Sequence, residues 1–280
     1  MPTIDLNQEY EIESKVPNVG ELQARYAELS ATAATLPGAN LDLSYGQTPL
    51  QALDLFLPAS KPVPAIMFFH GGYWRAGSKE TRRFAAAPWL ERGIAWVPVG
   101  YRLAPDVTMD DIVADARAAV AWFHTNAARL GCDPDRIHVA GNSAGGHLAG
   151  MLAADGWQDA MDLPSDVVKS VVGVSGLYDL TPLRRTFVND WLSLDADAAT
   201  RNSPIHAPPR AGLPILLSWG GRESDEFKRQ SRDYAEVCRS GGADVSLLER
   251  EDADHFSIIG EFGQPESPLF AAIAGQLSVA

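Results

Sequence analysis

The sequence predicts an α/β fold in which a mostly parallel central sheet is flanked by helices. Short, nearly all-apolar segments typical of buried strands recur along the chain, separated by segments with helical periodicity. Strands that alternate with helices in this way favour parallel pairing with right-handed crossovers. A serine between glycines, in the segment 141–145, lies directly between one such strand and the helix after it. Ligands are expected outside the carboxyl ends of the strands.

The first part of the chain is expected to form an arm, over residues 1 to about 35, which carries a helix at 19–29. Residues 50–57 alternate apolar and polar side chains in part, which is typical of a half-exposed edge strand. Residues 63–70 and 93–100 are nearly all apolar, as in strands covered on both faces. The alternation of strands and helices thus begins after the arm.

The second part of the chain continues the alternation. Apolar residues at helical spacing predict a helix from about Asp110 to Leu130. A strand at 136–140 leads into the serine motif, and a helix follows it at 146–154. Further buried strands are expected at 171–175, 213–219 and 244–249. Further helices are expected at 226–240 and near the C-terminus.

One stretch, residues 181 to about 210, does not fit the alternation. It contains aromatic residues and several prolines, and it is expected to form a small helical cap over the strand ends. A solvent-exposed connector is the alternative. We favour the cap because a connector of this length inside a compact domain usually has a function. Residues 1–280 are then one domain with an arm and a cap.

Composition and charge exclude several classes of protein. With 280 residues the chain can bury the core of one large α/β domain. A net charge of −13 and a pI near 4.8 disfavour nucleic acid and anionic membrane surfaces as partners. No apolar run approaches the ~20 residues of a membrane-spanning helix, and no secretory signal is recognisable. The expected partner is a small-molecule substrate, and the sequence leaves a homodimer open.

The two cysteines, Cys132 and Cys238, lie far apart and fit no metal-ligand spacing. We interpret both as thiols in a reducing cytoplasm. The sequence has no H-E-x-x-H motif, no paired Cys or His with ligand spacing, and no G-x-G-x-x-G after a strand. It therefore predicts neither a metal nor a cofactor.

The motif Gly141-Asn142-Ser143-Ala144-Gly145 is typical of a nucleophile elbow. Its glycines permit a turn so tight that a Cβ at either position would clash with the neighbouring backbone. The turn presents the Ser143 hydroxyl at the start of a helix, where unpaired N–H groups favour negative charge. Ser143 is therefore the candidate nucleophile.

A serine needs a base, and His255 is the candidate among the six histidines. It follows the last expected strand, in a loop that opens at the same end of the sheet as the elbow. The histidine also comes after the serine in chain order, as in hydrolases with this elbow. The other histidines are expected to be structural or exposed.

A carboxylate that orients the base is expected after the strand at 213–219. Glu223 and Asp225 both follow that strand closely. Asp225 is also suited to the first turn of the next helix, which is an ordinary role for Asp. Glu223 lies closer to the strand end, so we favour Glu223 and keep Asp225 as the alternative.

Backbone N–H groups are the expected donors to the oxyanion of a tetrahedral intermediate. One donor is expected at Ala144, directly after the nucleophile. The others are expected at Gly72 and Tyr73, in the glycine-containing loop after the strand at 63–70. Glycine there lets the backbone approach a substrate closely.

These residues are those of the α/β-hydrolase fold, and the chain resembles the arylformamidases (kynurenine formamidases of the serine-hydrolase type) and their bacterial carboxylesterase-like relatives. The likeness covers about residues 20–262. It is carried by HGGYW at 70–74, GNSAGGHLAG at 141–150, SGLYDLTPL at 175–183, ESDEFKRQS at 223–231 and DHFSII at 254–259. In the family the acid lies just before an S-P-E-F-like segment, which places it at Glu223, where many relatives have Asp.

The resemblance implies hydrolysis of N-formylkynurenine or of aryl and short-chain esters, without deciding between them. We expect an amidase for an N-formyl aromatic amine, with a carboxylesterase for small aryl or short-chain esters as the alternative. A non-catalytic binding protein is disfavoured because both the serine and the histidine are present. The residues expected to contact substrate are Tyr73, Trp74, Asn142, Tyr178, Trp191 and Phe256.

Overall fold

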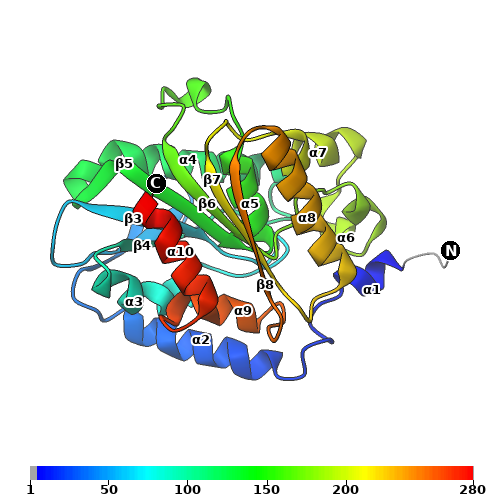
Figure 1. Cartoon of the computed structure of the whole chain (residues 1–280), viewed down its shortest axis with the longest axis horizontal. Helices are drawn as coiled ribbons and strands as arrows, with labels where there is room; N and C mark the ends of the chain where they lie inside the picture. Colours follow the sequence, from blue (N-terminus) through cyan, green and yellow to red (C-terminus); the bar gives the residue numbers. More distant parts are fainter. Residues whose placement is uncertain (1–4, 280) are drawn as a thin grey trace.

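The computed structural model describes residues 5–279 and contains one eight-stranded sheet with helices on both faces (Figure 1). In sheet order the strands are β1 (Ala39–Ser44), β2 (Ala52–Phe56), β4 (Ala95–Val99), β3 (Val63–Phe69), β5 (Cys132–Asn142), β6 (Val168–Val174), β7 (Pro214–Gly220) and β8 (Asp244–Arg250). The pairs β1–β2 and β2–β4 are antiparallel, and the remaining pairs are parallel. The predicted α/β class and mostly parallel sheet are confirmed.

Two helical layers cover the sheet. The helices that pack on one face are α4 (Met109–Leu130), α5 (Ala144–Ala153) and α8 (Asp225–Ser240). Those on the other face are α2 (Val19–Ala33), α3 (Ala86–Glu91), α9 (Ser257–Gly260) and α10 (Pro268–Val279). Among the described helices, none combines the length and apolarity needed to cross a membrane.

The prediction that residues 50–57 form a half-exposed strand at the edge of the sheet was wrong in both respects. Residues 52–56 form β2, which is buried throughout and has a neighbour on each side. Its polar residue, Asp54, is fully buried because Lys79 Nζ lies 2.9 Å and Arg83 Nε 2.6 Å from its carboxylate oxygens. The apparent alternation in sequence therefore came from a buried ion pair. The true edge is β1, which the sequence analysis did not predict.

The segment 244–249 was expected to be a buried strand, and this was also wrong. It forms β8, the other edge of the sheet, whose residues are mostly exposed or half-buried. Leu247, for example, keeps 38% of its surface exposed. Because β8 pairs only with β7 within the described chain, its apolar residues have fewer neighbours than those of an inner strand.

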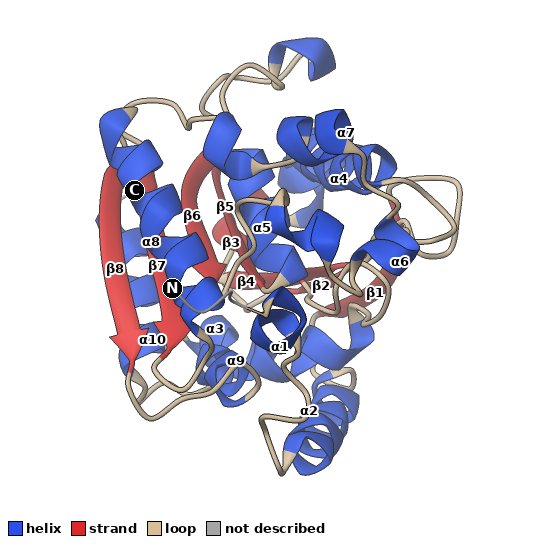
Figure 2. Cartoon of the chain, turned by 90° about the vertical axis from the view of Figure 1, so that its right-hand side faces the viewer, coloured by secondary structure: helices blue, strands red, loops and turns tan. Residues whose placement is uncertain are grey.

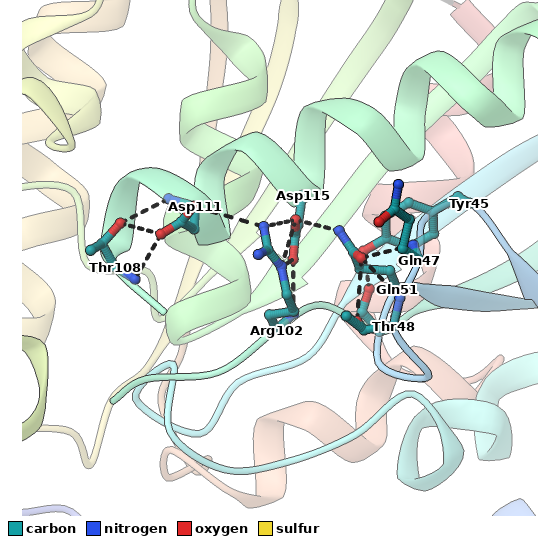
Figure 3. Close-up of polar contacts among 9 residues, drawn as sticks. Tyr45, Gln47, Thr48, Gln51, Arg102, Thr108, Asp111 and Asp115 are labelled. Atoms are coloured by element: carbon teal, nitrogen blue, oxygen red, sulfur yellow. Dashed lines mark hydrogen bonds and ion pairs between the residues drawn. The ribbon is translucent and has the colours of Figure 1, made fainter. Parts of the chain in front are cut away.

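The loop after β4 is fastened to α4 by a cluster of polar contacts, drawn in Figure 3. Asp115 accepts hydrogen bonds from Arg102 Nη2 at 2.7 Å and from Gln51 Nε2 at 2.8 Å. At the start of α4, the Thr108 hydroxyl accepts from the backbone N–H of Asp111 at 3.3 Å, while the Asp111 carboxylate accepts from the N–H of Thr108 at 3.0 Å. This reciprocal capping box fixes where α4 begins.

Short helices precede and interrupt this core. The helix α1 (Leu6–Tyr10) comes before α2, and residues 181–210 contain η3 (Pro182–Arg185), α6 (Asn189–Leu192), α7 (Ala196–Arg201) and η4 (Pro204–His206). Helices α1 and α6 both lie on the side of the molecule that faces the viewer in Figure 2. Contacts between α1 and η3 bring the two segments together.

Candidate active site

The turn between β5 and α5 has the strained backbone that the glycine–serine motif predicts. Ser143 has φ 55° and ψ −120°, a positive φ that L-residues rarely adopt. A Cβ on Gly141 would lie 2.2 Å from the carbonyl oxygen of Gly145, and one on Gly145 would lie 1.9 Å from the carbonyl oxygen of Phe69. Only glycine fits at both positions, and this close packing holds Ser143 at the head of α5.

A cavity of about 730 Å³ opens at this turn and is lined by both Ser143 and His255. His255 reaches it from the loop between β8 and α9, where the Asp254 carboxylate accepts hydrogen bonds from the N–H groups of Phe256 at 2.9 Å and Ser257 at 2.8 Å. A cavity of this size holds a small organic ligand. The structure thus brings together two residues that are far apart in sequence.

The carboxylate beside His255 is that of Glu223. The Nδ1 atom of His255 lies 3.1 Å from Glu223 Oε2, and both side chains are buried. The other oxygen, Oε1, accepts hydrogen bonds from the N–H of Gly220 at 2.7 Å and from the Ser175 hydroxyl at 2.5 Å. Asp225 is exposed in the first turn of α8, so the alternative acid does not contact the imidazole.

Ser175 is a contact that sequence reasoning missed. It follows β6 with φ 50°, and its hydroxyl is directed at Glu223. Two sequence signals pointed to it: its place at the carboxyl end of an inner strand, and its position as the first residue of the motif SGLYDLTPL. Since Ser175 and Gly220 both donate to Oε1, the second oxygen of Glu223 stays available to His255.

The Ser143 hydroxyl makes no hydrogen bond to any described residue. It shares the cavity with His255 but makes no hydrogen bond to the imidazole. Hydrogen bonds between a nucleophile and its base are often long in ligand-free enzymes and tighten when substrate binds. The arrangement allows the imidazole to take the serine proton once the two approach.

The loop after β3 lines the same cavity with Gly71, Gly72 and Tyr73. Gly72 has φ 121° and Tyr73 φ 49°, and a Cβ on Gly72 would lie 2.2 Å from the carbonyl oxygen of Ala76. Asn142 Oδ1 accepts from the N–H of Gly71 at 3.2 Å and so ties this loop to the elbow. The N–H groups of Gly72 and Tyr73 donate to no described residue. Ala144, the first residue of α5, has no intrahelical acceptor for its N–H.

Three of the aromatic residues expected at the site, Tyr73, Trp191 and Phe256, line the cavity. So does Asn142, whose amide is also engaged with Gly71. Burial raises the pKa of the Tyr73 phenol well above its usual range, so this hydroxyl is neutral and acts only as a donor or acceptor. Its side chain donates to the carbonyl oxygen of Tyr10.

Two other aromatic residues were wrongly expected at the mouth. Trp74 is fully buried in the core, and its indole N–H donates to His147 Nδ1 at 3.1 Å. Tyr178 is buried as well and stacks on Tyr234 with ring centroids 4.3 Å apart. The loops after β3 and β6 carry these two side chains into the core on the α5 side of the sheet. Adjacent residues can therefore differ in environment: Tyr73 lines the cavity, whereas Trp74 is buried. Burial lowers the pKa of His147 to about 4, which keeps its ring neutral as a structural contact.

The arm supplies a wall of the cavity that the sequence analysis did not predict. Its lining residues are Tyr10, Glu11, Ile12, Glu13 and Gln23. Tyr10 anchors the arm because its hydroxyl donates to Glu226 Oε2 at 2.9 Å and accepts from Gln230 Nε2 at 3.0 Å. No motif in residues 1–35 indicated this role, since the contacts join positions more than 200 residues apart in the chain.

No cluster of three or more His, Cys, Asp or Glu side chains suited to a metal ion occurs within residues 5–279. A strained serine between β5 and α5 shares a cavity with a buried imidazole–carboxylate pair, on a mostly parallel sheet covered by helices. This combination identifies the protein as an α/β-hydrolase.

Comparison with known proteins narrows the class. The BD-FAE family model matches residues 53–204. Kynurenine formamidase from Danio rerio is 34% identical over 226 residues, covering 78% of this chain and 75% of the relative. Carboxylesterase NlhH from Mycobacterium tuberculosis is 40% identical over 207 residues, covering 66% and 63%. A candidate thioesterase from Silicibacter sp. tm1040 superposes with a TM-score of 0.83 at 31% identity, covering 97% and 100% of the two chains.

The chain therefore belongs to the BD-FAE family of α/β-hydrolases, among its arylformamidase and carboxylesterase-like members. It is a hydrolytic enzyme, as the sequence analysis predicted.

Proposed function

We propose that the enzyme cleaves its substrate through an acyl-enzyme on Ser143, with His255 as base and Glu223 as the acid that orients it. The observation that supports this most is the contact of His255 Nδ1 with Glu223 Oε2 in the cavity that Ser143 lines. A carboxylate on Nδ1 fixes the tautomer in which Nε2 can accept the serine proton. The same carboxylate stabilises the imidazolium that then forms.

In the first step the Ser143 oxygen attacks the acyl carbon while its proton passes to His255. The oxyanion that develops would accept from the N–H groups of Gly72, Tyr73 and Ala144, which donate no hydrogen bond to a described residue. His255 then gives the proton to the departing nitrogen or oxygen, and the amine or alcohol leaves. Water, deprotonated by the same imidazole, attacks the acyl-enzyme and releases the acid together with free Ser143.

The substrate we propose is an N-formyl aromatic amine similar to N-formylkynurenine. Tyr73, Trp191 and Phe256 line the cavity and can pack on an aromatic ring in offset or edge geometry. The likeness to kynurenine formamidases supports the formamide. A second candidate, a carboxylesterase for small aryl or short-chain esters, is supported by the likeness to carboxylesterase NlhH.

The cellular setting we propose is the cytoplasm. Cys132 and Cys238 are both buried and unpaired, as expected for thiols that need no oxidising compartment. Burial raises the pKa of the Cys132 thiol to about 12, so it stays protonated and unreactive.

A fluorophosphonate probe and a substrate panel test the proposal. An activated Ser143 reacts with the probe, and peptide mass spectrometry should find the label on that residue. Turnover of N-formylkynurenine is compared with that of p-nitrophenyl acetate at equal enzyme concentration. No turnover of the formamide, with rapid turnover of the ester, makes the enzyme a carboxylesterase. Absence of labelling at Ser143 contradicts the mechanism for both substrates.

A further inference from the structure

Arg82 is a cation in the catalytic cavity that the proposed chemistry does not use. It lies in η1 (Glu80–Ala85), the short helix that follows the Gly72–Tyr73 loop, and it lines the cavity together with Ser143 and His255. The groups near its charge include the phenols of Tyr26 and Tyr101, which are neutral, and His70, whose pKa burial lowers to about 4, so its ring is neutral as well. Burial lowers the pKa of Arg82 to about 10, so the guanidinium remains charged at neutral pH.

The guanidinium of Arg82 has almost no partner. Nη1 donates to the carbonyl oxygen of Thr81 at 3.2 Å, while Nε is buried without an acceptor. Nη2 donates to no described residue, and no described carboxylate lies within ion-pair distance. The next residue, Arg83, shows the contrast: its Nε donates to the buried Asp54 at 2.6 Å. Two adjacent arginines thus differ in that one has its counter-ion inside the protein.

The other charges of the cavity do not neutralise Arg82. Arg75 is exposed, with its guanidinium 4.8 Å from the centre of the Trp191 ring. Glu11 and Glu13 belong to the arm; the Glu11 carboxylate accepts from the N–H and hydroxyl of Ser14, and Glu13 is exposed. Arg82 is therefore the partly buried cation of the cavity for which the described chain provides no anion.

A buried charge without a counter-ion is costly, and arginine is suited to pair with a planar carboxylate. We infer that Arg82 binds a carboxylate of the substrate, remote from the bond that is cleaved, and so selects acidic aryl amides or esters over neutral ones. This inference rests on the proposed hydrolase site, because the same cavity must hold the acyl group at Ser143. It adds a specificity-determining residue and a substrate charge to that site.

Two substrates that differ only in charge test it: 3-(4-acetoxyphenyl)propanoate and its primary amide. For each enzyme the ratio of kcat/KM for the acid to kcat/KM for the amide is measured. Arg82→Gln should lower this ratio about 10- to 100-fold, since hydrogen bonds to charged groups contribute about that much. The ratio for Arg82→Lys should lie between that of the wild-type enzyme and that of Arg82→Gln. Arg92→Gln, an exposed arginine outside the cavity, is the matched control and should leave the ratio unchanged.

Inhibition of the wild-type enzyme gives a readout that does not depend on the folding of a variant. We expect 3-phenylpropanoate to inhibit competitively at least tenfold more tightly than 3-phenylpropanamide. Equal inhibition by the two compounds, or an acid-to-amide ratio that Arg82→Gln does not change, overturns the inference. A ratio lost in Arg75→Gln and kept in Arg82→Gln also overturns it, because the exposed arginine then reads the charge.

Failure of the proposed formamidase activity is distinguishable from failure of this inference. If N-formylkynurenine is not cleaved but the ester ratio depends on Arg82, the formamidase proposal fails and the inference holds. If N-formylkynurenine is cleaved and its kcat/KM is insensitive to Arg82→Gln, the inference fails and the formamidase proposal holds.

Discussion

Two polar regions of the molecule handle buried charge in opposite ways. In the cluster of Figure 3, both carboxylate oxygens of Asp115 accept hydrogen bonds: Oδ1 from Gln51 and Arg102, and Oδ2 from Arg102. In the cavity, the Ser143 hydroxyl and the Nε of Arg82 have no partner within the described chain. The first region fastens a loop to a helix. The second keeps donors and a nucleophile unpaired at the cost of stability, which is typical of a site built to meet a ligand.

Glu223 combines features of the two regions: one carboxylate oxygen is fully paired within the fold, and the other serves the catalytic cavity. Its Oε1 accepts hydrogen bonds from Gly220 and Ser175, as in a structural cluster, while the one polar partner of its Oε2 among the described residues is His255. The hydrogen bonds to Oε1 therefore hold the carboxylate in the orientation in which Oε2 meets His255. Substitutions in the two regions should separate cleanly: changes in the cavity should cost activity, and changes in the Asp115 cluster should cost stability.

The largest effect is expected from Ser143→Ala. Loss of the nucleophile should lower kcat for any substrate of the panel by about four to six orders of magnitude, while the thermal unfolding midpoint changes little. Steady-state kinetics and differential scanning calorimetry on the same preparation measure both. Residual activity above about one per cent, in a preparation free of wild-type enzyme, would show that another group attacks the substrate.

Glu223→Gln should be the next largest. The amide keeps the shape but loses the charge that stabilises the imidazolium and fixes its tautomer, so kcat should fall by about 10³- to 10⁴-fold. Asp225→Asn is the matched control, since Asp225 is exposed and does not contact His255; it should stay within about threefold. Equal losses in the two variants would return Asp225 to consideration as the acid.

Asp115→Ala tests the structural side of the comparison. It leaves Arg102 without its carboxylate, and because the Arg102 side chain keeps 27% of its surface exposed, the cost should be below that of a fully buried pair. We expect about 2–3 kcal/mol of lost unfolding free energy in urea titrations. Asp106→Ala, at an exposed position, should change it by less than about 0.5 kcal/mol. A loss below about 1 kcal/mol would mean that the cluster contributes little to stability.

Thr108→Ala should have the smallest effect. Removing the capping hydroxyl of α4 should cost about 1 kcal/mol of unfolding free energy, with activity preserved. Thr125→Ala, an exposed site inside the same helix, should instead be neutral or stabilising by a few tenths of a kcal/mol, because Ala has the higher helix propensity. The same sign at both sites would argue against a capping role for Thr108.

The sequence predicted best where local constraints are strongest. The strand at 63–69 is continuously apolar, and α4 has periodic apolar residues after a capping threonine. The backbone around positions 141 and 145 leaves space only for glycine. Each of these signals lies within a few residues of the structure it determines. For the same reason the sequence alone predicts where the serine and its turn lie and the order of the later elements.

The misplaced features depend on contacts between distant segments. Asp54 looked solvent-facing because its partners, Lys79 and Arg83, come from another part of the chain. Trp74 and Tyr178 lie in loops next to the site, yet the backbone turns carry them into the core. The cavity wall formed by the arm depends on Tyr10 meeting Glu226 and Gln230 in α8, and no local pattern encodes such a meeting.

The hydrogen bond from the Tyr73 side chain to the carbonyl oxygen of Tyr10 links that wall to the loop carrying two of the candidate N–H donors. A library that varies residues 11–13 would therefore remodel one wall of the cavity while sparing β5, α5 and the His255 loop. For an engineer, the N-terminal segment is the economical place to redirect selectivity, provided Tyr10 itself is retained.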